Sequence, residues 1–265
     1  MPICLSCLDR RRTLLLLGSA TFAPLAGCQQ LGEAGASLVS PEQERAMGQQ
    51  AFARIRKEMP RSTNAAYQAT LRRVGQRIVA VSGSAIPPAQ WDFVVFRSDQ
   101  VNAFALPGGH VGAFEGLMRL VSGDAELAAV IGHEVGHVVA RHSAQRVGAS
   151  EVSQLGVGVL AAVLGAYGYA DPRTAQALLG AGAEYGIILP FSRSQELEAD
   201  SIGLRLMAKA GYDPEAAISF WQKMMHTGGP KPPAILSTHP ADQERIARLE
   251  ALLPEAERTY RGVVG

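Results

Sequence analysis

The chain has few cysteines, no excess of charge of either sign and no long apolar run. Its three cysteines, Cys4, Cys7 and Cys28, all lie within the first 28 of 265 residues. If the first two leave with a signal segment and the third carries lipid, no internal disulfide remains, and the fold must rest on core packing and metal. The formal net charge of +1 gives no electrostatic support for nucleic-acid binding.

The N-terminus has the pattern of an export signal. Arg10, Arg11 and Arg12 precede an apolar run at 14–23, and Leu-Ala-Gly-Cys follows at 25–28. The apolar run is too short to span a bilayer, so we expect residues 1–27 to be a signal peptide. Its end resembles the lipobox of bacterial lipoproteins, in which the cysteine, here Cys28, is acylated. An uncleaved anchor or plain secretion is the alternative, and the arginine pair leaves Sec and twin-arginine export both open.

Residues 124–146 contain the pattern HExxH, at His133, Glu134 and His137. Positions four apart share one helix face, so both imidazoles can bind one cation, which suits zinc with a water in an open position. Glu134 lies beside the metal and can take a proton from that water. Asp124 is expected to cap this helix, which has apolar residues at helical spacing and basic residues in its last turns.

A second helix is expected to supply the third ligand. Ser192 opens the segment SRSQELEAD, in which Glu196 and Asp200 are four apart while Glu198 points elsewhere. We therefore predict that Glu196 binds zinc and that Asp200 accepts a hydrogen bond from a ligating histidine. The alternative is a solvated acidic helix face paired with Arg193.

Strand patterns precede the motif helix at 91–96, 101–106 and 110–114, with a Pro-Gly-Gly turn at 107–109. A hairpin in this position is ordinary scaffold, but a free strand edge beside a metal can hold an extended peptide by main-chain hydrogen bonds. The edge residues would be Asn102, Ala103, Phe104 and Ala105.

The remaining segments are expected to support the site or to cover it. Ser40, Pro41 and Gln43 have the pattern of a helix start, and a second helix is expected from residue 67 to 81. Two nearly uncharged stretches, 155–169 and 175–189, are more consistent with packed helices than with membrane contact. A Gly- and Pro-rich loop at 228–233 has the composition of a lid. His239, taken alone, would most often be a surface or capping histidine.

Four segments together resemble one family: VNAFALPGGHV, HEVGHVVARHS, SRSQELEAD and STHP with Arg245. They are similar to gluzincin metallopeptidases, including the CAAX prenyl endopeptidases, HtpX and the mitochondrial inner-membrane stress protease, and most of all to small periplasmic lipoprotein peptidases of the LoiP and BepA type. The resemblance implies an α+β, mostly helical zincin domain at 41–265, with a small sheet or hairpin before the HExxH helix. Residues 28–40 would be a flexible tether.

The resemblance also implies roles. His133, His137 and Glu196 would bind one zinc per chain, Glu134 would be the base, and Asp200 would support the ligands. His239 matches a loop histidine that occupies the fourth zinc position at rest, and Arg245 matches an arginine associated with activity. The segment 101–106 matches the family's substrate-binding edge.

We therefore expect a lipid-anchored zinc endopeptidase that faces the periplasm and cleaves unfolded or misassembled envelope proteins. Gln29 after Cys28 favours the outer membrane under the usual lipoprotein sorting pattern. Partners would be other envelope lipoproteins or the outer-membrane assembly machinery, and no nucleic acid. The alternatives are a metal-stabilised chaperone or adaptor lipoprotein with little peptidase activity, and a hydrolase of cell-wall peptide.

Overall fold

The computed structural model describes residues 39–146, 191–226, 233–239 and 241–265. Its elements in chain order are α3 (Pro41–Glu58), α4 (Ala65–Ala80), the 3-10 turn η1 (Pro88–Gln90), β1 (Asp92–Phe96), β2 (Ala103–Leu106), β3 (His110–Phe114), α5 (Glu115–Leu120), α6 (Asp124–Val139), α9 (Arg193–Lys209), α10 (Glu215–His226), α11 (Ile235–Thr238) and α12 (Gln243–Val264). The predicted signal peptide, Cys28, both apolar stretches and most of the 228–233 loop lie outside the described residues.

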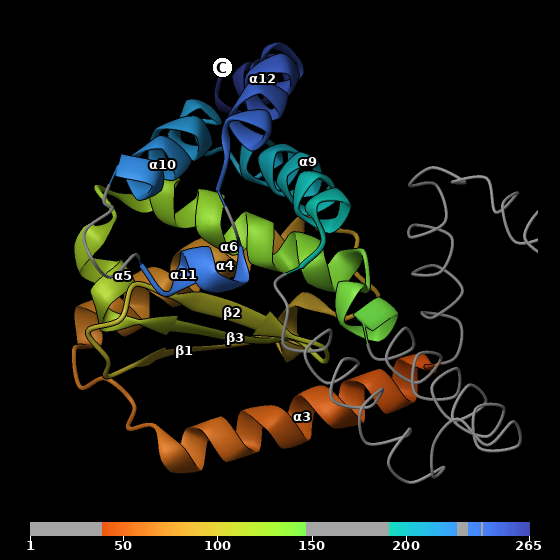
Figure 1. Ribbon diagram of the computed structural model, residues 1–265, viewed down its shortest axis with the longest axis vertical. Coiled ribbons are helices and arrows are strands. Elements are labelled where there is room, and N and C mark those ends of the chain that lie inside the picture. Colours follow the sequence, from red (N-terminus) through yellow and green to blue (C-terminus); the bar gives the residue numbers. More distant parts are fainter. Residues whose placement is uncertain (1–38, 147–190, 227–232, 240) are drawn as a thin grey trace, which may run out of the picture.

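The elements form layers around a small sheet (Figure 1). The sheet has the order β1-β3-β2, with β1 parallel and β2 antiparallel to β3. Helix α3 covers one face, α4 and α6 cover the other, and α9, α10 and α12 lie beyond α6. The expected α+β, mostly helical fold with a small sheet before the motif helix is confirmed. Among the described helices, none is long and apolar enough to cross a bilayer.

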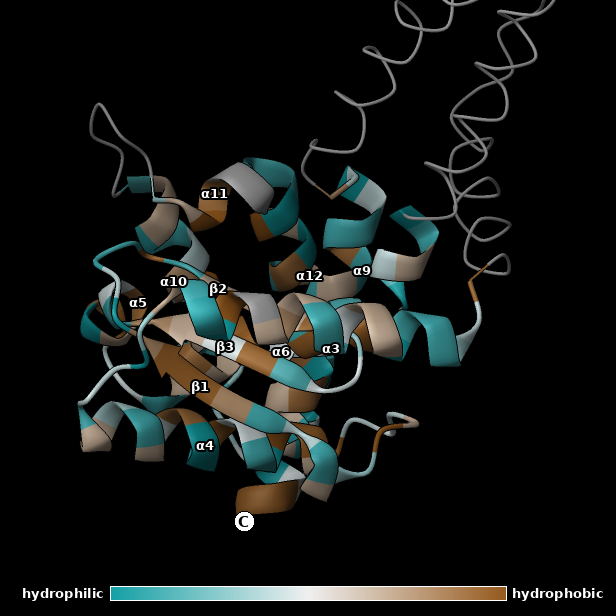
Figure 2. Cartoon of the chain, turned by 90° about the horizontal axis from the view of Figure 1, so that it is seen from below, coloured by the Kyte–Doolittle hydropathy of each residue, from teal (hydrophilic) through white to brown (hydrophobic). Residues whose placement is uncertain are grey.

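Alternation along the strands builds two cores. One face of the sheet carries Val94, Phe96 and Phe114, which pack with Phe52 of α3. The other face faces α4 and α6 and belongs to the main core. Because successive strand residues point to opposite faces, a strand buried on both faces is apolar throughout, as β1 is after its first residue. The helices are banded in brown and teal (Figure 2), the pattern of helices buried on one side.

Strand β2 is at the edge of the sheet, and its free side faces α6. The amide of Phe114 donates to the Asn102 carbonyl (3.1 Å), and that of Gly109 donates to the Leu106 carbonyl (3.3 Å). Alternation in an antiparallel ladder therefore turns the main-chain groups of Ala103 and Ala105 away from β3. This strand is available for an added partner strand.

Several expected helix boundaries are confirmed. Ser40 caps α3 and Ser192 caps α9, each in a capping box closed by a glutamine three residues later. The reason is local: the serine hydroxyl accepts a hydrogen bond from the backbone amide of the glutamine, and the glutamine side-chain oxygen accepts one from the backbone amide of the serine. The start of α9 fixes the register of the acidic residues that follow.

Other boundaries were wrong. Asp124 does not cap α6; the cap is Gly123, without a side-chain bond, and Asp124 pairs instead with Arg73 of α4. The helix ends at Val139 because Arg141 adopts a left-handed backbone with φ of 55°, so the basic residues of 141–146 lie past its end. Strands β1 and β2 begin one and two residues later than expected, which leaves Asn102 just before β2.

Candidate metal centre

Glycines bring α6 and α9 into close contact at the motif. A Cβ on Gly132 would lie 2.9 Å from the Gly203 carbonyl oxygen, and one on Gly136 would lie 2.9 Å from the Ala199 carbonyl oxygen. Only residues without side chains allow the two backbones to approach this far. The faces that meet carry the motif histidines of α6 and two acidic residues of α9, Glu196 and Asp200.

Four side chains converge there: His133, His137, Glu196 and His239, all buried, with ligand atoms within 4.8 Å of one another. The two motif Nε2 atoms are 3.1 Å apart, and each is 3.4 Å from a Glu196 oxygen. His239 Nδ1 lies 3.2 Å from His133 Nε2 and 3.0 Å from Glu196 Oε1. His239 is thus part of the cluster and not a surface histidine.

The cluster fits zinc. Ligand atoms about 2.0–2.1 Å from a tetrahedral zinc lie roughly 3.3 Å from one another, close to the separations observed. Three imidazoles and a carboxylate are also the donor types that zinc prefers. When Glu134, Glu196 and Asp200 are ionised, the three carboxylates outweigh the charge of Arg245 by two, which a divalent cation balances.

Asp200 and Arg245 form a second layer behind the cluster. Asp200 Oδ1 lies 2.8 Å from His133 Nδ1, so it accepts a hydrogen bond from the Nδ1–H group, and Nε2 of this tautomer is free for the metal. Arg245 donates to both Asp200 oxygens at 2.7 Å and lies 2.9 Å from Glu196 Oε2. Its guanidinium stacks over Trp221 at 4.1 Å. Arg245 therefore holds the two acidic residues of α9 that contact the motif histidines.

These contacts shift the pKa values of the buried groups. Burial lowers the pKa of His133, but the charge of Glu196 and the hydrogen bond with Asp200 outweigh it and raise the pKa to about 9. For His137 burial dominates and holds the pKa well below its usual value. Burial raises the pKa of Glu196, but the neighbouring histidines lower it far below the usual range. Without metal, the cluster therefore retains a proton on His133, which zinc must displace.

Glu134 lies between the cluster and the edge strand. Its Oε2 accepts from the Ala105 amide at 3.3 Å. Its buried Oε1 accepts no hydrogen bond from the described residues, although His239 Nε2 is 3.3 Å away. Because this lone pair is not engaged by an aligned donor, the carboxylate can receive a proton beside the cluster.

Sequence reasoning missed two contacts of His137. Its Nδ1 lies 2.8 Å from Nδ1 of the buried His142, and its ring stacks on Phe191 at 4.0 Å. His142 is five residues after His137, and this nearness in sequence could have marked it as a neighbour of the motif. Phe191 carried no such signal. The alternative of a solvated acidic helix face paired with Arg193 is wrong: Glu196 and Asp200 are buried, and Arg193 pairs with residues just before and in α12.

A family model described as peptidase family M48 matches residues 65–253, which include the sheet, both site helices and Arg245. The chain belongs to peptidase family M48. The M48 peptidases use zinc, and the buried cluster gives this chain the means to bind it.

Two relatives illustrate the M48 similarity. The mitochondrial metalloendopeptidase OMA1 of Schizosaccharomyces pombe is 39% identical over 224 residues, 83% of this chain and 64% of that protein. The beta-barrel assembly-enhancing protease of Escherichia coli is 32% identical over 224 residues, 82% of this chain and 45% of that protein. The chain thus spans about half to two thirds of the length of these two relatives.

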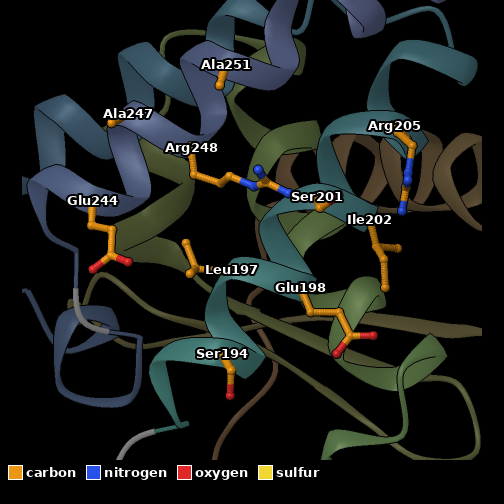
Figure 3. Close-up of a pocket in the computed structure, with 10 residues that line it drawn as sticks. All are labelled: Ser194, Leu197, Glu198, Ser201, Ile202, Arg205, Glu244, Ala247, Arg248 and Ala251. Carbon is orange, nitrogen blue, oxygen red and sulfur yellow. The ribbon is translucent and has the colours of Figure 1, made fainter. Parts of the chain in front are cut away.

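A groove of about 780 Å³ lies on the opposite side of α9 from the M48 cluster. Figure 3 shows its lining residues on α9 and α12, with Leu197 between the two helices and Glu198 on the side of α9 away from α12. The cluster of His133, His137, Glu196 and His239 and this groove are therefore on opposite sides of α9.

Proposed function

We propose that the protein is a zinc-dependent endopeptidase in which His133, His137 and Glu196 hold the metal. The observation that carries the proposal is the position of Glu134, with one oxygen bonded to the edge strand and the other beside the cluster. A purely structural zinc site needs no such carboxylate.

Bound in this cluster, zinc would lower the pKa of a water and polarise a carbonyl oxygen. Glu134 accepts the proton of the attacking water and passes it to the leaving amine. The main-chain groups of Ala103 and Ala105 hold the peptide as an added strand, and the Ala105 amide gives up its hydrogen bond to Glu134 when the peptide pairs there. Asp200 and Arg245 keep His133 and Glu196 oriented and touch no reacting atom.

The edge strand sets the substrate class. A chain can pair with β2 only if it presents an extended backbone with free amides and carbonyls. Folded proteins have already paired most of these groups, whereas unfolded or misassembled ones have not. We therefore propose that unfolded envelope proteins are the substrates.

His239 has a restraining role in this proposal. Its Nδ1 lies with the ligand atoms of the cluster, and a neutral imidazole there would take the position that the attacking water needs. Removal of His239 from the cluster must then precede cleavage.

The site of action rests on Cys28, which lies outside the described residues. Its lipobox-like context supports a lipid-anchored protein that faces the periplasm, and Gln29 supports the outer membrane. Other envelope lipoproteins or the outer-membrane assembly machinery are the proposed partners. In a Cys28→Ser variant, we expect the protein to leave the membrane fraction or to accumulate as precursor; unchanged processing and fractionation would contradict the anchor.

The decisive experiment compares the full chain with its Glu134→Gln variant. Each is incubated with a protein substrate in unfolded and folded form, with and without a chelator. We expect cleavage by the wild-type protein and not by the variant. The wild type should cleave the unfolded form of the substrate and not the folded form, and the chelator should abolish this cleavage. The variant should contain equal zinc and lose about 10²–10⁴-fold in rate. Binding of unfolded protein without cleavage by wild type would favour the chaperone alternative instead.

A further inference from the structure

The second ring nitrogen of each motif histidine has a different partner. His133 faces the carboxylate of Asp200, the usual arrangement for a metal ligand. His137 faces another imidazole: its Nδ1 is 2.8 Å from Nδ1 of His142. On its far side, His142 Nε2 lies 3.2 Å from Glu198 Oε2.

One arrangement of protons satisfies this chain of contacts. His137 presents Nε2 to the cluster, so its hydrogen is on Nδ1. That hydrogen is donated to His142 Nδ1, because two nitrogens 2.8 Å apart need one donor and one acceptor. The hydrogen of His142 is then on Nε2, where it is donated to Glu198. Every ring nitrogen along the path has a partner of the right kind.

We propose that His142 and Glu198 are positioning residues for the metal, holding His137 in the tautomer and ring orientation that bind zinc. The inference rests on the proposed zinc site. His142 is fully buried, so no water replaces its contact. The stacked ring of Phe191 limits rotation of His137 from another side. Both ligands on α6 are thus oriented by residues of α9, one by Asp200 directly and one by Glu198 through His142.

The two positioning residues differ in exposure, and their effects should differ accordingly. Figure 3 shows Glu198 on α9 with its carboxylate directed away from α12. Its side chain is 52% exposed, so water can replace part of its hydrogen bond. His142 should therefore matter more than Glu198.

The test measures zinc affinity by chelator competition in full-length His142→Phe, His142→Asn, Glu198→Ala and a matched control, Glu250→Ala on α12. Phenylalanine keeps the ring but removes both nitrogens, and loss of such a partner typically weakens metal binding about 10–100-fold. The Asn Oδ1 takes the place of Nδ1, so His142→Asn should recover most of the affinity. Glu198→Ala, which removes the acceptor of the His142 Nε2 hydrogen, should weaken zinc binding a few-fold, and the control should leave it unchanged.

Two further readouts separate positioning from general destabilisation. The absorption bands of the cobalt-loaded protein report ligand geometry, and we expect them to shift in His142→Phe and return in His142→Asn. The melting temperature of each metal-free variant reports the scaffold. If His142→Phe does not fold, the comparison of Glu198→Ala with Glu250→Ala decides, since both changes are at the surface.

Wild-type zinc affinity and cobalt bands in both His142→Phe and Glu198→Ala would overturn the inference while leaving the zinc peptidase intact. An affinity loss that His142→Asn does not recover would also overturn it. If wild type itself binds no zinc and cleaves nothing, the proposed function fails, and the positioning role falls with it.

Discussion

Replacing Gly203 by alanine tests whether close helix packing builds the metal centre. Gly203 is on α9, contributes no ligand and is outside the HExxH motif. A Cβ placed there would stand 2.7 Å from the His133 main-chain nitrogen and 2.8 Å from the Gly132 carbonyl carbon. Both neighbours are backbone atoms, so no side-chain rotation relieves the contact. The two helices must move apart.

The required movement is small for the fold but large for a metal. Ordinary contacts begin near 3.4 Å, so α9 must shift by about 0.7 Å. Overpacking of this kind costs about 1–3 kcal/mol, while alanine in a helix recovers roughly 0.5–1 kcal/mol relative to glycine. The net loss of stability is therefore modest. Zinc sites hold ligand distances to about 0.2 Å, and Glu196 moves with α9, so we expect zinc affinity to fall at least about tenfold.

The assay pairs denaturant unfolding of the metal-free protein with zinc competition against a chelator. Gly262→Ala is the matched control, because Gly262 is also helical and its Cβ would meet nothing within 4 Å. This control should gain up to about 1 kcal/mol and bind zinc as wild type does. Wild-type zinc affinity in Gly203→Ala would refute the packing argument.

Four other changes probe the site. Arg245→Met leaves two buried carboxylates without their cation and should lower the free energy of unfolding by about 3–5 kcal/mol. The control Arg193→Met, at a side chain that is 65% exposed, should change it by less than about 1 kcal/mol. Equal effects of the two changes in denaturant titrations would contradict this prediction. Glu196→Ala should release zinc to a chelator that wild type resists, and retention would remove Glu196 from the ligand set. Ala105→Pro removes an amide that faces away from the sheet ladder and donates to Glu134, so zinc content should persist while cleavage of an unfolded substrate falls; full activity would show that neither the peptide nor Glu134 needs this amide. His239→Ala should keep zinc and raise basal cleavage, and a joint loss of stability and activity would indicate a structural role.

Sequence patterns predicted the parts of the site that depend on one helix at a time. Periodicity of 3.6 residues places His133 and His137 on one face and separates Glu196 and Asp200 from Glu198, whatever the helices pack against. The serine and glutamine of a capping box act within four residues, so the start of α9 was equally predictable. The sheet strands were recognisable by composition, but not the parallel pairing of β1 with β3, which needs contacts distant in sequence.

By itself, the sequence therefore determined which residues share one face of each helix, because backbone geometry repeats along an element. Only the tertiary structure decided which elements meet. Glycines at the contact of α6 and α9 brought Glu196 to the histidines, and α12 placed Arg245 against Asp200 and Glu196. Asp124 shows the same limit. The local pattern predicted a helix cap, but in the fold its carboxylate pairs with Arg73, which is distant in sequence. His142 and Glu198, 56 residues apart, are joined only by folding.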